Sequence, residues 1–103
     1  MNALTFSALA EPNRLSIVEL LREGPSTVSE ISRRLVIRQP QASKHLQVLK
    51  EAGLVSVQPI AQQRIYALQA GPFEDLSGWL ETYKPTWKAR LDSMENYLQT
   101  SKN

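Results

Sequence analysis

Residues 26–55 read STVSEISRRLVIRQPQASKHLQVLKEAGLV, and this stretch decides the fold. Two short runs within it have apolar residues at spacings of three and four, the pattern of an amphipathic helix. These apolar residues are Val28, Ile31 and Leu35 in the first run and Ala42, Leu46 and Leu49 in the second. Ser26 or Thr27 can cap the first helix, and Gly53 can supply the left-handed residue that ends the second. The pattern predicts a helix-turn-helix over about residues 27–53.

The outward face of the second helix is polar, and its side chains suit the reading of base edges. These side chains are Gln41, Ser43, Lys44, Gln47 and Lys50, with Gln39 at the helix entrance. Glutamine pairs bidentately with adenine, lysine reaches guanine or phosphate, and serine reaches either. We therefore expect this helix to contact the major groove of double-stranded DNA.

The run QPQASKHLQVLKEAGLV resembles the recognition-helix signature of ArsR/SmtB-type winged-helix repressors, in which a Ser-x-His-Leu core leads into Leu-x-x-Ala-Gly-Leu-Val. The likeness continues upstream through ALAEPNRLSIVELLREG and downstream through RIYAL, so it covers about residues 3–98. Within that family the chain is most similar to the cysteine-free, non-metal-sensing SdpR-like members, whose last helix has a similar Tyr…Trp…Leu pattern. The resemblance implies a mainly α fold with a small β-hairpin wing: a dimeric winged helix-turn-helix that represses transcription.

The segments around the helix-turn-helix predict two preceding helices and the wing. Helices are expected over about residues 3–10 and 12–23, since Pro12 suits a first turn and Gly24-Pro25 ends the second. The second should bury Leu15, Val18 and Leu21, and Ile17 is a further candidate for burial. Strands over 54–58 and 64–69, joined by a turn around Pro59–Gln63, should form the wing over about residues 54–69.

A long apolar stripe marks the last helix, which is expected over about residues 73–100. Pro85 lies inside it and removes one backbone hydrogen bond, so we expect a kink or break near Tyr83–Lys84. The stripe exceeds what one small domain can cover, which predicts a homodimer interface. The expected interface residues are Leu4, Phe6, Leu9, Leu80, Tyr83, Trp87, Leu91, Met94 and Leu98. The alternative is a helix that packs only within its own domain. With or without a dimer, residues 1–103 are expected to form a single domain.

The charge distribution favours DNA as a partner more than the net charge of +2 does. Residues 26–64 have six basic side chains against only two acidic ones, Glu30 and Glu51. The six are Arg33, Arg34, Arg38, Lys44, Lys50 and Arg64. Residues 73–103 are nearly balanced, with four basic and five acidic side chains. Positive charge is thus gathered where nucleic acid would lie.

Three positions leave open how closely the chain follows the family pattern. His45, the only histidine, could contact DNA through a hydrogen bond or a phosphate, or could have a structural role. Val36 stands where the family usually has glycine, so we expect the turn to take another route. The wing tip lacks the usual Gly-Arg, although Arg64 can still reach a phosphate or the minor groove.

Metal-dependent and enzymatic chemistry find little support in the sequence. With no cysteine and one histidine, thiolate and zinc sites lack their ligands, and the pair Asp92 and Glu95 is too small a set for a hard cation. We therefore expect no metal, no cofactor and no enzyme. No run approaches the roughly 18 apolar residues of a membrane span, so a cytoplasmic, nucleoid-associated protein is expected.

Two other functions remain open for the same fold. A winged helix can bind protein instead of DNA, but its second helix would then present an apolar or acidic face. The chain could also be an anti-repressor that has kept the fold and lost DNA contact, for which the altered wing tip leaves room. The operator, the regulated genes and the effector are not indicated by the sequence.

Overall fold

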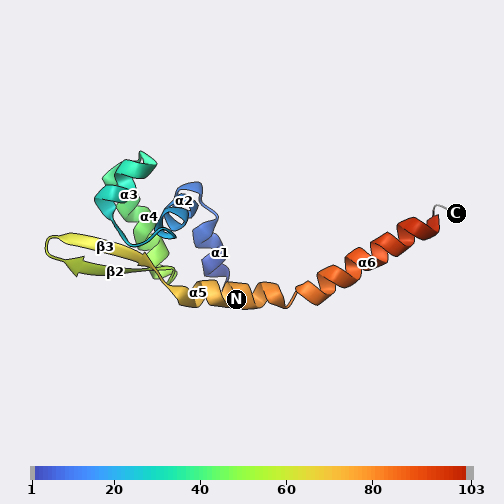
Figure 1. The fold of residues 1–103 in the computed structure, drawn as a ribbon. Helices are drawn as coiled ribbons and strands as arrows, with labels where there is room; N and C mark the ends of the chain where they lie inside the picture. The colour runs from blue at the N-terminus through green and yellow to red at the C-terminus, as the bar shows by residue number, and fades with distance from the viewer. Residues whose placement is uncertain (1, 102–103) are drawn as a thin grey trace. The chain divides into compact units, whose positions relative to one another are not determined.

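The computed structural model of the chain describes residues 2–101, so Met1 and residues 102–103 of the expected single domain lie outside it. The chain forms two compact units, Met1–Phe73 and Glu74–Asn103. The elements of the first unit, in chain order, are α1 (Ala3–Leu9), α2 (Pro12–Leu21), β1 (Ser26–Thr27), α3 (Val28–Leu35), α4 (Gln39–Glu51), β2 (Val55–Ile60) and β3 (Gln63–Leu68). In Figure 1 the hairpin β2–β3 projects from the helices α1–α4 as a wing. The mainly α fold with a β-hairpin wing is confirmed.

The two N-terminal helices begin at side-chain caps. The side chain of Asn2 accepts a hydrogen bond from the N–H of Leu4 at 2.8 Å, and Glu11 caps α2 through the N–H of Arg14 at 2.9 Å. Pro12 takes the first helical position, where a missing N–H costs nothing.

The inner face of α2 differs from the expected one at Leu15 and Leu20. Ile17, Val18, Leu20 and Leu21 are buried, whereas Leu15 is 46% exposed. The expectation that Leu15 is buried was wrong. It precedes Ile17 by two residues, and at about 100° per residue it therefore lies near the opposite side of the helix.

The helix-turn-helix forms as predicted. Thr27 is the residue that caps α3, because its hydroxyl accepts from the N–H of Glu30 at 3.2 Å. Ile31 of α3 and the three predicted residues of α4, Ala42, Leu46 and Leu49, are all completely buried. Gly53, just beyond α4, has φ 77°, the left-handed conformation expected of it.

The turn between α3 and α4 keeps its left-handed residue although that residue is valine. Val36 has φ 54° and ψ 50° and is 87% exposed, so the expectation of another route was wrong. The carbonyl of Ser32 accepts from the N–H groups of both Val36 and Ile37, the second at 3.1 Å, as in a Schellman-type helix end. The Ser32 hydroxyl also donates to the carbonyl of Ile37, whose side chain packs against the core. The hydrogen bonds of Ser32 and the packing of Ile37 stabilise the left-handed conformation of Val36, which valine by itself disfavours.

The wing is a tighter hairpin than the sequence indicated. Strands β2 and β3 pair from Val55 with Leu68 to Ile60 with Gln63, so only two residues form the turn. The expected turn around Pro59–Gln63 was therefore too long. Strand β2 lies at an edge of the sheet, whose order is β1-β3-β2, and an edge strand tolerates a proline. The first turn residue, Ala61, has φ 56°, a position that usually favours glycine.

The last helix is divided in two, as expected from its proline. Helix α5 spans Ala70–Glu81 and α6 spans Lys84–Ser101, with Pro85 in the first turn of α6. The break near Tyr83–Lys84 is therefore confirmed. Helix α5 begins three residues earlier than expected, because Pro72 lies within its first turn, where a backbone N–H has no helical partner.

Candidate nucleic-acid interface

Helix α4 presents the predicted polar side chains to solvent because its other face is fixed in the core. Ala42, Leu46 and Leu49 are completely buried, and α4 packs against α2, α3 and β2. The exposed side chains are Gln39, Gln41, Ser43, Lys44, Gln47 and Lys50. Their carbonyl, amide, hydroxyl and ammonium groups are those that hydrogen-bond to base edges and phosphates. The structure thus brings this predicted set together on one element.

Two of these glutamines are positioned by hydrogen bonds to neighbouring side chains. Gln39 Nε2 donates to Ser29 Oγ at 2.7 Å and so connects the start of α4 to α3. Gln47 Nε2 donates to Glu51 Oε1 at 3.1 Å, one turn further along α4. The sequence pattern alone did not reveal either contact, although the i, i+4 spacing of Gln47 and Glu51 is a signal for the second.

The start of α4 has a cation where many helices have a capping side chain. Arg38 stands at the N-cap, and its side chain makes no capping hydrogen bond. The side chain is exposed at the end of the helix where backbone N–H groups lack helical partners. From this position the Arg38 side chain can approach a phosphate.

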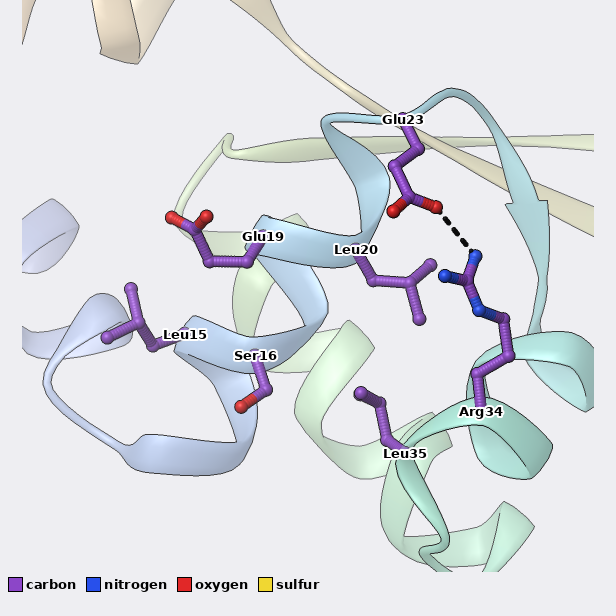
Figure 2. Close-up of a pocket in the computed structure, with 7 residues that line it drawn as sticks. All are labelled: Leu15, Ser16, Glu19, Leu20, Glu23, Arg34 and Leu35. Atoms are coloured by element: carbon purple, nitrogen blue, oxygen red, sulfur yellow. Dashed lines mark ion pairs between the residues drawn. The ribbon is translucent and has the colours of Figure 1, made fainter.

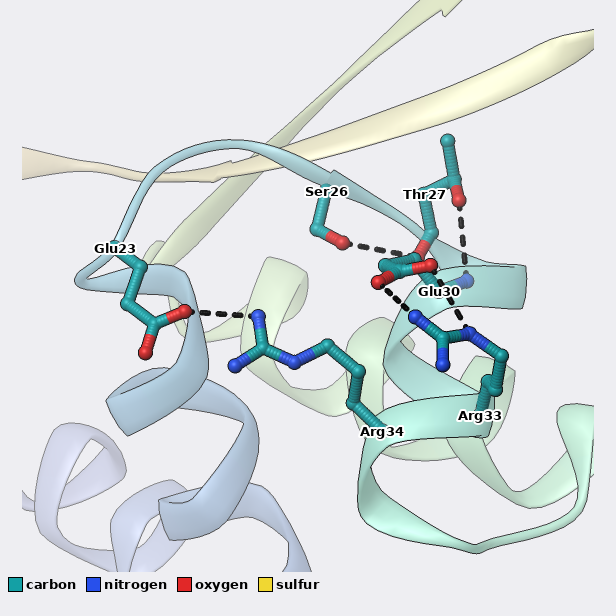
Figure 3. A network of polar contacts seen from close by, with 6 residues as sticks. All are labelled: Glu23, Ser26, Thr27, Glu30, Arg33 and Arg34. Carbon is teal, nitrogen blue, oxygen red and sulfur yellow. Dashed lines mark hydrogen bonds and ion pairs between the residues drawn. The ribbon is translucent and has the colours of Figure 1, made fainter.

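Two of the six basic side chains counted over residues 26–64 are paired with carboxylates within the protein. Arg34 Nη1 lies 2.8 Å from Glu23 Oε2, and Arg33 Nη2 lies 2.6 Å from Glu30 Oε1. Figure 3 shows both ion pairs as dashed lines. The hydrogen bond from Arg34 and its charge hold the pKa of Glu23 below its ordinary value. The same contact with Glu23 raises the pKa of Arg34. The count of charges over residues 26–64 missed the pairing of Arg34 with Glu23, because Glu23 precedes that stretch.

The four remaining cations are exposed and have no ion pair with any residue in the range 2–101. They are Arg38, Lys44, Lys50 and Arg64. Three of them lie on α4 or at its start. Arg64 pairs in register with Pro59, one residue from the end of the hairpin. The excess of positive charge therefore lies at α4 and the wing, and is smaller than the sequence count suggested.

His45 is less exposed than the predicted polar set, although it lies one helical turn beyond Gln41 on α4. Its side chain is 20% exposed, and its Nδ1 is 3.7 Å from Glu11 Oε2. The same Glu11 oxygen caps α2 by accepting from the N–H of Arg14. Of the two roles expected of His45, this geometry favours the structural one; its contact with DNA remains a prediction.

A shallow groove of about 450 Å³ lies between α2 and α3 (Figure 2). Its lining residues are Leu15, Ser16, Glu19, Leu20, Glu23, Arg34 and Leu35. The Arg34 guanidinium and the Glu23 carboxylate neutralise each other there. These seven residues include no histidine or cysteine.

The expected dimer-interface residues lie on α1, α5 and α6, except Tyr83 in the break between α5 and α6, and most are solvent-exposed. Trp87 is 64% and Leu91 53% exposed, and with Tyr83 and Met94 they line an open furrow along α6. On α1, Leu4 and Phe6 are exposed, whereas Leu9 packs against the core of the first unit. The face along α6 is thus apolar and open within its own unit.

The described part of the chain, residues 2–101, contains no group of three or more histidine, cysteine or acidic residues that could hold a metal ion. Asp92 and Glu95 are both exposed on α6. Across the same residues, each helix is too short or too polar to cross a membrane.

Comparison with known proteins identifies the same fold and motif. A helix-turn-helix domain model matches residues 9–58. The transcriptional repressor SdpR of Bacillus subtilis is 32% identical over 75 residues, which is 73% of this chain and 83% of SdpR. The transcriptional regulator Rv2034 of Mycobacterium tuberculosis is 44% identical over 63 residues, 61% of this chain but only 59% of Rv2034.

A solved structure gives the same result. The crystal structure of an ArsR family transcriptional regulator superposes with a TM-score of 0.74 at 29% identity, over 84% of this chain and 89% of that one. These relatives are transcription regulators, a class of proteins that are not enzymes. The chain therefore belongs to the ArsR family of winged helix-turn-helix transcriptional regulators.

Proposed function

We propose that this chain is a sequence-specific DNA-binding repressor that acts as a homodimer on an inverted-repeat operator in the cytoplasmic nucleoid. The observation that carries the proposal is the outward face of α4, where exposed Gln41, Ser43, Lys44 and Gln47 stand on a helix whose other side is completely buried. A rigid helix with hydrogen-bonding groups is suited to direct readout in the major groove.

The charges that are free of internal partners support phosphate contacts around this helix. Arg38 and Lys50 lie at the two ends of α4, and Arg64 lies on the wing. Lysine and arginine contacts to phosphates orient a protein on the duplex without reading sequence. We propose that Arg38, Gln39, Lys50 and Arg64 position the protein, while the side chains in the middle of α4 read bases.

The apolar face of α6 supports a homodimer. Exposed aromatic and aliphatic side chains recur along it at helical spacing, namely Tyr83, Trp87, Leu91, Met94 and Leu98. A two-fold dimer would cover this face with its own copy and would place two α4 helices at a fixed separation. The half-sites of the operator would then be about 10 base pairs apart, or a multiple of that distance.

Repression by this chain would not depend on a metal ion. The chain has no cysteine, and its only histidine lies in the middle of α4, beside Glu11. Zinc and similar ions would therefore lack the sulfur and nitrogen ligands that they prefer. The effector that releases DNA would be of another chemical kind.

Selection from a random duplex DNA library with the purified chain, followed by gel shifts, tests the proposal. Enrichment of an imperfect inverted repeat is the expected result. If the folded chain enriches no sequence, the proposal is wrong, and a protein-binding or anti-repressor role takes its place. The variant with both Gln41 and Gln47 changed to alanine is the matched control, since it should lose the enrichment and keep the fold.

A further inference from the structure

The amide of Gln47 is oriented by the carboxylate of Glu51, one turn further along α4. Gln47 Nε2 donates to Glu51 Oε1 at 3.1 Å. An ionised carboxylate only accepts hydrogen bonds, so the nitrogen of the Gln47 amide, and not its oxygen, must face Glu51. The orientation of this amide therefore follows from the chemistry of its partner.

Glu51 lies on the same helix face as the residues proposed to read DNA. Lys44, Gln47 and Glu51 follow one another at positions i, i+3 and i+7, and all three are exposed. Glu51 is the only acidic residue of α4. Its charge opposes the attraction of Lys44 for phosphate, so any benefit to DNA binding must come from a specific contact.

The hydrogen bond to Glu51 changes which groups Gln47 can offer to a base. A glutamine amide has two N–H donors and one carbonyl acceptor. Because one proton is given to Glu51, one donor and one acceptor remain. In the major groove adenine presents an acceptor, N7, and a donor, N6, whereas guanine presents two acceptors, N7 and O6. Gln47 in this state matches adenine with both groups and guanine with only one.

We infer that Glu51 is a specificity-positioning residue that directs Gln47 toward adenine and against guanine. The inference rests on the proposed function and deepens it, since it names the base that one residue of α4 reads. Without the constraint, the Gln47 amide can turn and give both protons to guanine.

Two substitutions of Glu51 separate this role from a simple effect of charge. Glu51→Gln keeps the length of the side chain and removes its charge. Glu51→Asp keeps the charge and, being one methylene shorter, loses the contact with Gln47. Glu51 is exposed at the last position of α4, where an acidic residue is unfavourable to the helix dipole, so both variants should fold. Thermal melts check this.

The experiment first finds the operator position read by Gln47, using sequences selected from a random duplex library. That position is the one at which Gln47→Ala loses base preference. Gel shifts with adenine or guanine at this position then give the ratio of the two Kd values. The unmodified chain should prefer adenine, and both Glu51 variants should lower the preference by about two- to tenfold, the range of one net hydrogen bond. Preferences at the other positions should not change.

Several results would overturn the inference. If Glu51→Asp keeps the full preference while Glu51→Gln changes affinity equally on all sequences, Glu51 acts only through its charge. If the position lost in Gln47→Ala is not an adenine, Gln47 is not oriented as inferred, although the proposed function survives. If the unmodified chain enriches no sequence, the proposed function fails and this inference fails with it.

Discussion

Arg34 of α3 and Glu23, two residues beyond α2, form an ion pair with 2.8 Å between Nη1 and Oε2. Arg34 is one of the six basic side chains counted where nucleic acid would lie, but this ion pair ties the first helix of the helix-turn-helix to the end of α2. The ion pair is at the surface, so its effect is local: it links α3 to the end of α2 and removes one charge from the set available to DNA.

The Glu23–Arg34 pair predicts a pH dependence of stability. The pKa of Glu23 is lowered in the folded chain, first by the hydrogen bond from Arg34 and then by its charge. A lowered pKa means that the contribution of the pair is complete above the unfolded value of about 4.3 and is lost as the pH falls through the lower folded value. The unmodified chain should therefore have a higher Tm than Glu23→Gln at pH 7, and the difference should shrink below about pH 4.

Thermal melts of both proteins from pH 7 to pH 3 check this prediction. Glu19→Gln is the matched control, because it breaks the exposed pair of Glu19 with Arg22 at the end of α2 and leaves α3 untouched. A Tm difference between Glu23→Gln and the unmodified chain that stays constant down to pH 3 would show that the pair does not act through the ionised carboxylate.

The glutamines of α4 predict the specificity of binding. Gln41→Ala or Gln47→Ala should cost on the order of 1–3 kcal/mol on operator DNA and much less on random DNA. The two residues are six apart and so point about 120° away from each other around the helix. They should consequently affect different operator positions. Gel shifts on single-position operator variants measure this, and equal losses on operator and random DNA would show that the glutamines touch only the backbone.

The salt dependence of binding distinguishes free cations from paired ones. Removal of Arg64, or of Arg38, should make the slope of log affinity against log salt shallower by about 0.9 per lost phosphate contact. Arg33→Ala is the matched control, since Arg33 already lies 2.6 Å from Glu30 and should leave the slope nearly unchanged. Titrations at several salt concentrations give the slopes. If Arg64→Ala leaves both affinity and slope as they were, the wing does not engage DNA.

Operator binding should be insensitive to zinc, cadmium and arsenite at stoichiometric levels. The physical reason is the lack of cysteine together with the position of the only histidine beside Glu11. Gel shifts with and without each ion, with a chelator as the control, check this. Reversible release of the operator by one ion, abolished by changing Asp92 and Glu95, would contradict it.

The face of α6 predicts that dimerisation and DNA binding are lost together. Truncating a buried aromatic or leucine typically costs about 2–5 kcal/mol. The double substitution Trp87→Ala with Leu91→Ala should therefore weaken or abolish the dimer and reduce operator binding, although no proposed DNA contact has changed. Asn96→Ala is the control, because Asn96 follows Trp87 by nine residues and lies on the opposite side of α6.

Analytical ultracentrifugation beside gel shifts decides this point. A monomeric double variant that binds the operator as tightly as the unmodified chain would refute the link between α6 and DNA. An unmodified chain that is monomeric at micromolar concentration would refute the dimer itself.

The elements that the sequence predicted well are those whose signals are local. Spacings of three and four placed α3 and α4, Thr27 and Gly53 marked their ends, and Pro85 marked the break before α6. Each of these depends on the chemistry of a few neighbouring residues. Local rules therefore sufficed for the helix-turn-helix and for the face of α4.

The features that the sequence missed depend on contacts that rules about single residues or helical spacing do not include. The left-handed Val36 is held by bonds to Ser32 and by burial of Ile37, which a rule about single residues does not include. The loss of Arg34 from the cationic set depends on Glu23, eleven residues earlier. The length of the wing strands depends on the edge position of β2, which only the sheet order reveals.

The most direct test of the account is the ratio between two affinities of the unmodified chain, measured at the same salt concentration. One is its Kd for the inverted repeat enriched from a random library, and the other is its Kd for random duplex DNA of equal length. The account predicts tighter binding to the repeat by a factor of at least about 10³, the lower range of specific recognition. A ratio near one would contradict it, because the exposed face of α4 would then be reading no sequence.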